Sequence, residues 1–335
     1  MEHGLGRVGV GLVLLLAGSC QSAPEPGVYT FVFENDVFAH VDSNYTNGVG
    51  LSWVSPVTAP SGDGTFLERI VDRASFLPGV GSPDREHHVG FLFAQEMFTP
   101  DDITIPNPPR TDRPYAGVLL LDTSVFARDE DSMHTWTLKL GVVGPPALAE
   151  ETQTIVHRWI GSNKPEGWDH QLHTEPLVNL NYAYDRRIVE TEVLGLEFDL
   201  TSNVGGAFGN YAIFANTGVA LRWGRNLTDS YGTQSLRAGT QSNSVVLTPP
   251  AKPFGWNLFV GTQGFLAGRF LPQDGNTFID SRGVDTETLV GSASFGFVVN
   301  YKRVLMTVSF TAFSDTFEGQ KQAMEYGSFL LTWSP

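Results

Sequence analysis

The sequence contains a single cysteine, Cys20, and no long apolar run after its N-terminal region. One cysteine excludes an internal disulfide framework and a metal site built from thiolates. A helix that spans a membrane needs about 20 consecutive apolar residues. No later segment approaches that length, so the sequence predicts no transmembrane helix.

Positive charge is also scarce. The 335 residues include 21 Lys and Arg against 36 Asp and Glu, which gives a net charge of −15. Proteins that bind nucleic acid rely on clustered cations, so a nucleic-acid partner is not expected. The acidic excess instead suits a soluble surface or the binding of a cation such as calcium. The length allows one large all-β domain or two ordinary ones.

The N-terminus has the pattern of an export signal. Arg7 precedes an apolar run from Val8 to Ala17, and small residues follow. This is typical of a secretory signal peptide. We expect residues 1–23 to be this peptide, cleaved at about residues 19–23, and residues 24–335 to form one domain; alternatively, Cys20 becomes a lipidated N-terminus. An exported protein without a transmembrane helix is periplasmic, is secreted, or forms a β-barrel in the outer membrane.

Alternation of apolar and polar residues dominates the exported part. In "TWTLKLGV", Trp136, Leu138, Leu140 and Val142 share one face, while the other face is mostly polar or small. Such a period of two predicts β-strands. We count twelve segments of this kind: 28–36, 47–55, 86–97, 113–126, 132–143, 174–186, 190–202, 209–223, 255–268, 286–299, 302–314 and 320–333.

A soluble β-sandwich would show the same alternation. The segments are, however, close to the about 9–11 residues of a tilted membrane strand, and their polar faces of Gly, Ser, Thr, Asn and acids suit a barrel lumen. An even strand number is also what bacterial barrels use. The predicted fold is therefore all-β, an antiparallel transmembrane β-barrel of twelve strands.

Connection lengths predict the orientation of this barrel. Short connections at 128–132, 186–190 and 300–303 are expected on the periplasmic side, which places 37–46, 98–112, 143–173, 203–208 and 269–285 outside. Two long connections, 57–85 and 224–254, then fall on the periplasmic side, where short turns are the rule. The pattern offers no physical account of those two.

One outer connection contains a predicted short helix. It begins after Pro145-Pro146 and ends at Gly161. We expect its packed face to consist of Leu148, Thr152, Ile155, Val156 and Trp159. Gln153 and His157 are four residues apart, so their side chains should lie together. A neutral imidazole at His157 could take a proton from water; the alternative is a surface or packing histidine.

The first predicted hairpin is rich in oxygen ligands. Asp36 shares the parity of Glu34, and Thr46 that of Gly48, so both are expected on the polar inner face at the barrel mouth. Asn35 has the opposite parity unless a bulge re-aims it or its backbone carbonyl takes part. Several oxygen ligands are what a hard cation needs. The alternative is an Asn- and Asp-rich surface loop.

Cations form a third group of candidates. Arg110 and Lys164 lie in connections expected on the outer side, where they could bind lipid phosphates; the alternative is solvated charge. Arg186 and Arg187 are expected at a turn on the opposite side, without a functional role.

Five ordered blocks carry a family resemblance: "FENDVF…YTNG…LSW", "FAQEMFTP", "DRPYAG", "GVVGPPALAEETQTIVHRWIG" and "GWDHQL…EP". Together they resemble the outer-membrane lipid A deacylase family, the LpxR type. The resemblance implies a twelve-stranded barrel that is a calcium-dependent esterase. Its substrate would be the 3′-linked acyloxyacyl group of lipid A in lipopolysaccharide, among the outer-membrane lipids.

The resemblance also implies site residues. The family's Asn-Asp pair falls on Asn35 and Asp36, with Ca²⁺ held there, and its threonine falls on Thr46. The Gln and His fall on Gln153 and His157, with the histidine as the base. Arg110 and Lys164 are expected to bind the substrate because of their place in the outer connections, and not because of the resemblance.

The chain departs from the family pattern in two places. Asn163 stands where some members carry an acid, and "DDITIPNPPR" replaces a loop with a Lys-Arg pair. Arg110 is the candidate substitute for that pair. Two other readings stay open: a catalytically inactive outer-membrane barrel, either a pore or a structural protein, and a soluble periplasmic β-sandwich that binds calcium.

Overall fold

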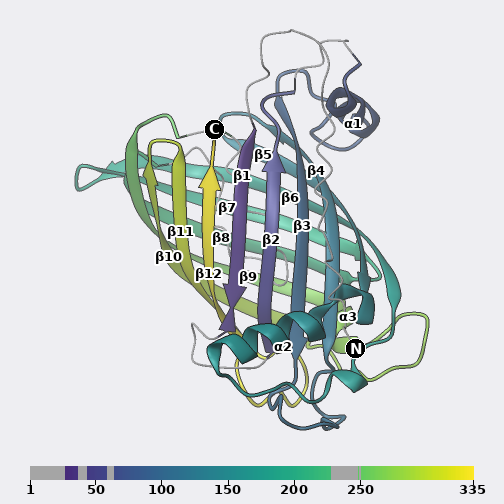
Figure 1. Ribbon diagram of the computed structural model, residues 1–335. Coiled ribbons are helices and arrows are strands. Elements are labelled where there is room, and N and C mark those ends of the chain that lie inside the picture. The colour runs from purple at the N-terminus through teal and green to yellow at the C-terminus, as the bar shows by residue number, and fades with distance from the viewer. Residues whose placement is uncertain (1–26, 37–43, 59–63, 228–247, 249) are drawn as a thin grey trace, which may run out of the picture.

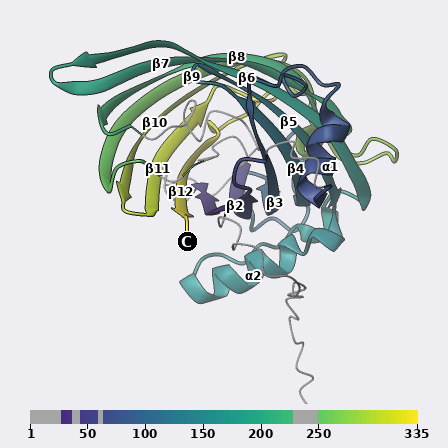
Figure 2. The ribbon, with the colours of Figure 1, turned by 90° about the horizontal axis from the view of Figure 1, so that it is seen from above.

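The structure, a computed structural model, describes residues 27–36, 44–58, 64–227, 248 and 250–335. The expected signal peptide and Cys20 lie outside these residues. The described chain forms a closed antiparallel barrel of twelve strands (Figures 1 and 2). The strands are β1 Val28–Asn35, β2 Asn44–Val54, β3 Glu86–Thr99, β4 Ala116–Arg128, β5 Ser132–Val143, β6 Glu175–Val193, β7 Leu196–Gly209, β8 Ala212–Arg225, β9 Phe254–Phe270, β10 Leu289–Tyr301, β11 Val304–Phe313 and β12 Glu325–Trp333. The predicted fold class and strand number are confirmed.

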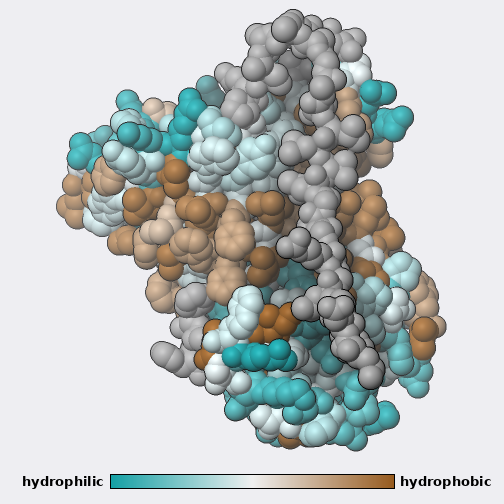
Figure 3. All heavy atoms as spheres, viewed as in Figure 1, coloured by the Kyte–Doolittle hydropathy of each residue, from teal (hydrophilic) through white to brown (hydrophobic). Residues whose placement is uncertain are grey.

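The barrel closes because β1 pairs with both β2 and β12. Tyr29, for example, lies opposite Trp53 on one side and Trp333 on the other. Alternation along each strand turns apolar side chains outward, and Leu51 is 59% exposed. These residues form an apolar band on the wall (Figure 3). Such a band suits a bilayer, whereas a soluble sandwich would bury its apolar face.

Inward-facing side chains fill much of the lumen. Buried ion pairs join Lys139 to Asp122 and Arg222 to Asp199. A second layer is apolar and aromatic, with the rings of Tyr45 and Tyr326 4.9 Å apart. The described residues thus favour a packed barrel over a wide aqueous pore.

Two of the predicted connections lie within strands. Residues 186–190, expected as a turn, lie within β6, and residues 203–208, expected as an outer connection, lie within β7. The β6–β7 turn is instead at Leu194 and Gly195, both with positive φ. A tight turn needs such φ values. Charged residues in β6 misled the prediction, since Arg187 pairs there with Glu190 and Asp199.

Two helices of similar length lie at opposite ends of the barrel (Figure 1). Helix α1, Phe66–Ala74, occupies part of the long β2–β3 connection, and Thr65 and Glu68 form a capping box at its start. Its Val71 packs with Val89 and Val125 of the wall. The other long connection, 224–254, lies largely outside the described residues.

Helix α2, Ala149–Ile160, follows the short helix η2, Pro145–Ala147, in the β5–β6 connection. Helix η3, Trp168–His170, lies further along the same connection, and α3, Leu271–Asp274, follows β9. No helix of the described residues is long and apolar enough to cross a membrane.

The predicted end of α2 at Gly161 is confirmed and its start lies at Ala149, after η2, but its predicted packed face is wrong. Ala149, Gln153 and His157 are the buried residues of α2, whereas Trp159 is 81% exposed. The physical reason lies in the wall. A Cβ at Gly117 would come within 2.5 Å of the Ala149 Cβ, so the smooth wall at Gly117 accepts this narrow face of α2 and leaves the bulky apolar face outside.

Candidate functional site

The first half of the candidate site lies where β1 ends and β2 begins. Asp36 follows β1 and is completely buried. Asn35 Nδ2 donates a hydrogen bond to the Thr46 carbonyl over 2.9 Å. Asn47 Nδ2 returns a bond of 3.2 Å to the Glu34 carbonyl. Side-chain amides therefore tie the two strand ends together, which is more order than a surface loop requires.

A β-bulge interrupts the predicted alternation at Thr46. The register between β2 and β3 shifts between Tyr45 and Asn47, so Thr46 is the extra residue. Tyr45 takes the inner place and donates to Glu34 Oε2 over 2.6 Å. Thr46 Oγ1 instead lies 2.7 Å from Thr99 Oγ1. Thr46 is buried, as expected of the inner face, but Tyr45 beside it is buried as well, because the bulge interrupts the alternation.

The second half of the site lies on α2. Figures 1 and 2 place this helix outside the ring of strands, beside the ends of β1, β2 and β3. Gln153 and His157 are buried on the same face as Ala149, which packs with Met97 of the wall. The structure thus brings the strand ends and the Gln153–His157 face to the same end of the barrel.

A backbone carbonyl orients His157. Gly161 ends α2 with φ of 73°, and the chain turns back so that His157 Nδ1 lies 2.6 Å from the Asn163 carbonyl. A carbonyl can only accept, so Nδ1 carries the proton and Nε2 of the neutral ring keeps its lone pair. The departure at Asn163 leaves this contact intact, because the contact uses the backbone and not the side chain.

A chain of contacts holds Gln153. Trp168 Nε1 donates to Gln153 Oε1 over 2.8 Å, and the rings of Trp168 and Tyr115 are 4.8 Å apart. Tyr115 in turn donates to the Ile103 carbonyl over 3.1 Å. A Cβ at Gly167 would come within 2.5 Å of the Tyr115 ring. Tyr115 of "DRPYAG" and Gly167 and Trp168 of "GWDHQL" therefore belong to one set of contacts that positions Gln153.

The contact with Trp168 also determines the orientation of the Gln153 amide. An indole N–H is only a donor, so the amide must present its oxygen to Trp168. Its nitrogen is buried and has no hydrogen-bond partner among the described residues. A buried donor without a partner costs free energy. Gln153 thus retains an unused donor beside His157.

Arg113 is a cation to which the sequence reasoning gave no role. It was predicted to begin a strand, but it precedes β4 and is completely buried. Its Nη2 donates to Thr316 Oγ1 over 3.2 Å, and the guanidinium lies over the Phe317 ring. Burial lowers the pKa of Arg113 to about 10, so the side chain stays charged at neutral pH. It joins two connections across the barrel mouth, which no sequence spacing would reveal.

The two expected substrate-binding cations lie in connections at the α2 end. Arg110 is exposed. Lys164 forms an exposed ion pair with Glu166 at 2.9 Å. Surface pairs of this kind are weak, so Lys164 can exchange Glu166 for another anion.

The donor set at the strand ends fits a hard cation. It combines one buried carboxylate, Asp36, with the amide of Asn35, the hydroxyl of Thr46 and nearby backbone carbonyls. Calcium prefers such all-oxygen sets. Among the described residues no group of three or more His, Cys, Asp and Glu is arranged so that it could hold a metal ion. A cation here would therefore need neutral oxygens in addition to the Asp36 carboxylate.

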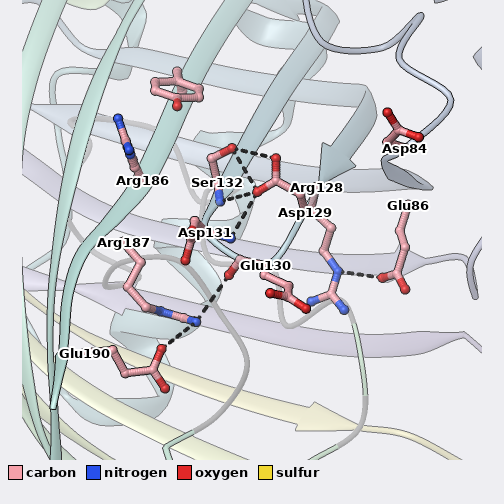
Figure 4. Close-up of a pocket in the computed structure, with 11 residues that line it drawn as sticks. Asp84, Glu86, Arg128, Asp129, Glu130, Asp131, Ser132, Arg186, Arg187 and Glu190 are labelled. Atoms are coloured by element: carbon pink, nitrogen blue, oxygen red, sulfur yellow. Dashed lines mark hydrogen bonds and ion pairs between the residues drawn. The ribbon is translucent and has the colours of Figure 1, made fainter.

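A hollow of about 1030 Å³ lies at the opposite end of the barrel (Figure 4). Several of its charged residues are paired: Arg128 donates to Glu86 over 2.9 Å, and Ser132 donates to Asp129 Oδ1 from both its backbone N–H and its hydroxyl. Arg186 and Arg187 line it, on the side where the sequence expected them. This network stabilises a turn, and none of the residues that the sequence singled out as catalytic lines the hollow.

A family model and a solved structure support this fold. A model of the family described as outer membrane protein LpxR matches residues 9–334. The solved structure of LpxR from Salmonella typhimurium covers 92% of this chain and 100% of its own, with a TM-score of 0.74 and 16% identity. The β domain of the Bordetella autotransporter BrkA covers 93% and 99%, with a TM-score of only 0.41 and 8% identity. The search of curated proteins finds no match.

The family match covers nearly the whole chain, and the barrel, its twelve strands and the outer helix agree with it. The chain is therefore an outer-membrane β-barrel that belongs to the LpxR family, the lipid A deacylase family whose sequence blocks it resembles.

Proposed function

We propose that this protein is a carboxylic ester hydrolase that removes the 3′-linked acyloxyacyl chain of lipid A. Family membership supports the substrate class. The orientation of His157 is the observation that carries the chemistry, since its Nδ1 contact of 2.6 Å with the Asn163 carbonyl leaves Nε2 as a base. The partners of this reaction are lipopolysaccharide and the surrounding outer-membrane lipids.

In the proposed mechanism His157 Nε2 removes a proton from a water molecule, and the resulting hydroxide attacks the ester carbonyl. A positioned base of this kind contributes about 10²–10⁴-fold in rate. The imidazolium then returns the proton to the leaving alkoxide on the sugar. The Asn163 carbonyl stabilises the imidazolium, because it accepts from Nδ1 in both protonation states.

Gln153 is proposed to donate its unused amide N–H to the carbonyl oxygen. Negative charge develops on that oxygen in the transition state, and a fixed donor stabilises it without reorganisation. Trp168 keeps the amide in place through its bond to Oε1. Asn35 and Thr46 hold the strand ends that face α2. Arg110 and Lys164 are proposed to contact the phosphates of lipid A.

Asp36 and Asn35 are the residues proposed to hold Ca²⁺. When bound, the ion would supply Lewis-acid polarisation of the ester carbonyl and compensate the developing negative charge. A buried carboxylate is stabilised by a nearby cation, which supports this assignment. No serine nucleophile is needed.

Mass spectrometry of lipid A tests the activity. Lipid A incubated with the purified full chain should lose the mass of one acyloxyacyl group from its 3′ position. An unchanged spectrum under every calcium condition would favour the alternative, a catalytically inactive barrel that serves a structural purpose.

Replacement of Asp36 tests the metal. Asp36→Asn keeps the size of the side chain but removes one negative charge, so it should raise the calcium concentration needed for half-maximal hydrolysis, and added Ca²⁺ should partly restore the rate. The measurement is hydrolysis against Ca²⁺ concentration for wild type and variant, with EDTA as the zero point. Overlapping curves, or full activity in EDTA, would refute a metal role for Asp36.

A further inference from the structure

Helix α2 presents three distinct faces. At about 100° per residue, its buried residues Ala149, Gln153 and His157 form one stripe toward the wall. A second stripe, on one flank, is polar and contains Glu150, Glu151, Thr154 and Arg158. The third stripe, on the other flank, is apolar and contains Leu148, Thr152, Ile155, Val156 and Trp159. We call this third stripe the apolar flank.

The apolar flank is open in the described part of the chain. Trp159 is 81% exposed, Leu148 55% and Ile155 44%. Even the one hydroxyl in the flank is satisfied within the helix, because Thr152 Oγ1 donates to the Leu148 carbonyl over 2.9 Å. The flank therefore offers no free hydroxyl proton to water, and its other side chains are apolar.

The position of α2 identifies what covers this flank. The helix lies outside the ring of strands (Figure 2), on the side of the wall where Phe31, Leu51 and Phe93 are exposed. Figure 3 shows apolar patches between the hydrophilic residues around α2 and the apolar band of the wall. The flank thus continues a surface that already faces lipid.

We propose that α2 is an interfacial helix whose apolar flank inserts among the acyl chains of the outer leaflet. Its polar flank stays in water, and its third face stays against the barrel. Helices with divided faces lie in this way at a depth of about 5–10 Å, and tryptophan favours this boundary. The partner is lipid and not a second protein, because the flank is continuous with the lipid-facing wall.

Insertion also has a consequence for the reaction. It sets the Gln153–His157 face close to the boundary between head groups and acyl chains, where the acyl esters of a lipid lie. A lipid would then reach the site sideways from the leaflet. This consequence rests on the proposed function, whereas the insertion itself rests only on the barrel and on α2.

Fluorescence quenching in bilayers tests the insertion. The full chain is reconstituted in phosphatidylcholine vesicles whose acyl chains carry bromine at defined depths, and the emission of Trp159→Phe is subtracted from that of wild type. We expect the Trp159 component to be quenched by bromines near the head-group boundary and protected from aqueous iodide.

The matched control is a tryptophan on the polar flank of the same helix. Thr154→Trp in the Trp159→Phe background should be quenched by iodide and not by bromolipid. Val156→Trp in that background provides a second reporter on the apolar flank, and heat-modifiable migration verifies that each variant is folded. Equal iodide quenching of the two flanks, without bromolipid quenching of either, would overturn the proposal. Quenching needs no catalytic activity, so this result is independent of the lipid A assay.

Discussion

The two helices α1 and α2 cover the same two wall strands, β3 and β4, at opposite ends of the barrel, yet they use opposite faces. Helix α1 packs its apolar residues, such as Val71, on Val89 and Val125. Helix α2 turns Gln153 and His157 to the wall and leaves its apolar residues outside. The comparison teaches that burial of a polar helix face beside an exposed apolar one can mark a functional helix, because packing alone would favour the reverse.

The largest expected effect comes from the polar face of α2. His157→Ala should lower hydrolysis by about 10²–10⁴-fold, because it removes the proposed base, while heat-modifiable migration of the barrel stays unchanged. The readout is the rate of lipid A hydrolysis by mass spectrometry. His173→Ala is the matched control, since His173 is an exposed histidine of the same connection. Wild-type activity in His157→Ala would eliminate His157 as the base.

The support of Gln153 should have the next largest effect. Trp168→Phe removes the donor to Gln153 Oε1 and leaves that buried oxygen unpaired, which costs about 1–3 kcal/mol of free energy. The Gln153 amide is then no longer held in place, so kcat should fall. If Trp168 acts through Gln153, the double variant Trp168→Phe/Gln153→Ala should be no slower than Gln153→Ala alone. Fully additive losses would contradict a positioning role for Trp168.

A change on α1 should affect stability and not activity. Val71→Ala removes two buried methyl groups and should cost about 1–2 kcal/mol, which makes the β2–β3 connection more sensitive to protease at unchanged hydrolysis. The same substitution at the exposed Val156 of α2 should leave protease sensitivity in detergent unchanged. Equal protease sensitivity of Val71→Ala and Val156→Ala would contradict the inference that α1, and not α2, packs its apolar residues on the wall.

The smallest expected effect distinguishes the glycines beside the two helices. Gly161 and Gly64 both have positive φ, and a Cβ at either would meet nothing within 4 Å. Alanine at each site therefore adds only backbone strain, about 1 kcal/mol. Gly161→Ala should slow hydrolysis several-fold because it disturbs the turn that brings the Asn163 carbonyl to His157. Gly64→Ala should not, and similar rates for both variants would argue against this role of the turn.

Much of the barrel could be predicted from alternation, because each strand faces lipid on one side and the lumen on the other. The boundaries of β5 were predicted to the residue, since a short turn follows β4 at Asp129. The β6–β7 turn was misplaced, because charged residues such as Arg187 resemble a turn in the sequence but continue the strand beyond the bilayer. The role of Arg113 depends on Thr316, about 200 residues away, and was out of reach.

The candidate site shows the same division. Gln153 and His157 were recognisable as a pair through helical spacing, and the family blocks singled out Asn35, Asp36 and Thr46. Their roles as catalytic or calcium-binding residues stay predictions, as do the substrate contacts of Arg110 and Lys164. The bulge at Thr46 could not be foreseen, because it depends on how β2 registers with β3.

The sequence by itself determined the strand count, the antiparallel order and the existence of α2, because these depend on local alternation, on short turns and on helix start and stop signals. Only the tertiary structure decided which face of α2 meets the wall. That choice depends on Gly117, which gives α2 a smooth surface, and on Trp168 and the Asn163 carbonyl, which satisfy Gln153 and His157. Contact between the apolar face of α2 and water is unfavourable. Because the barrel does not cover that face, it is left to the membrane.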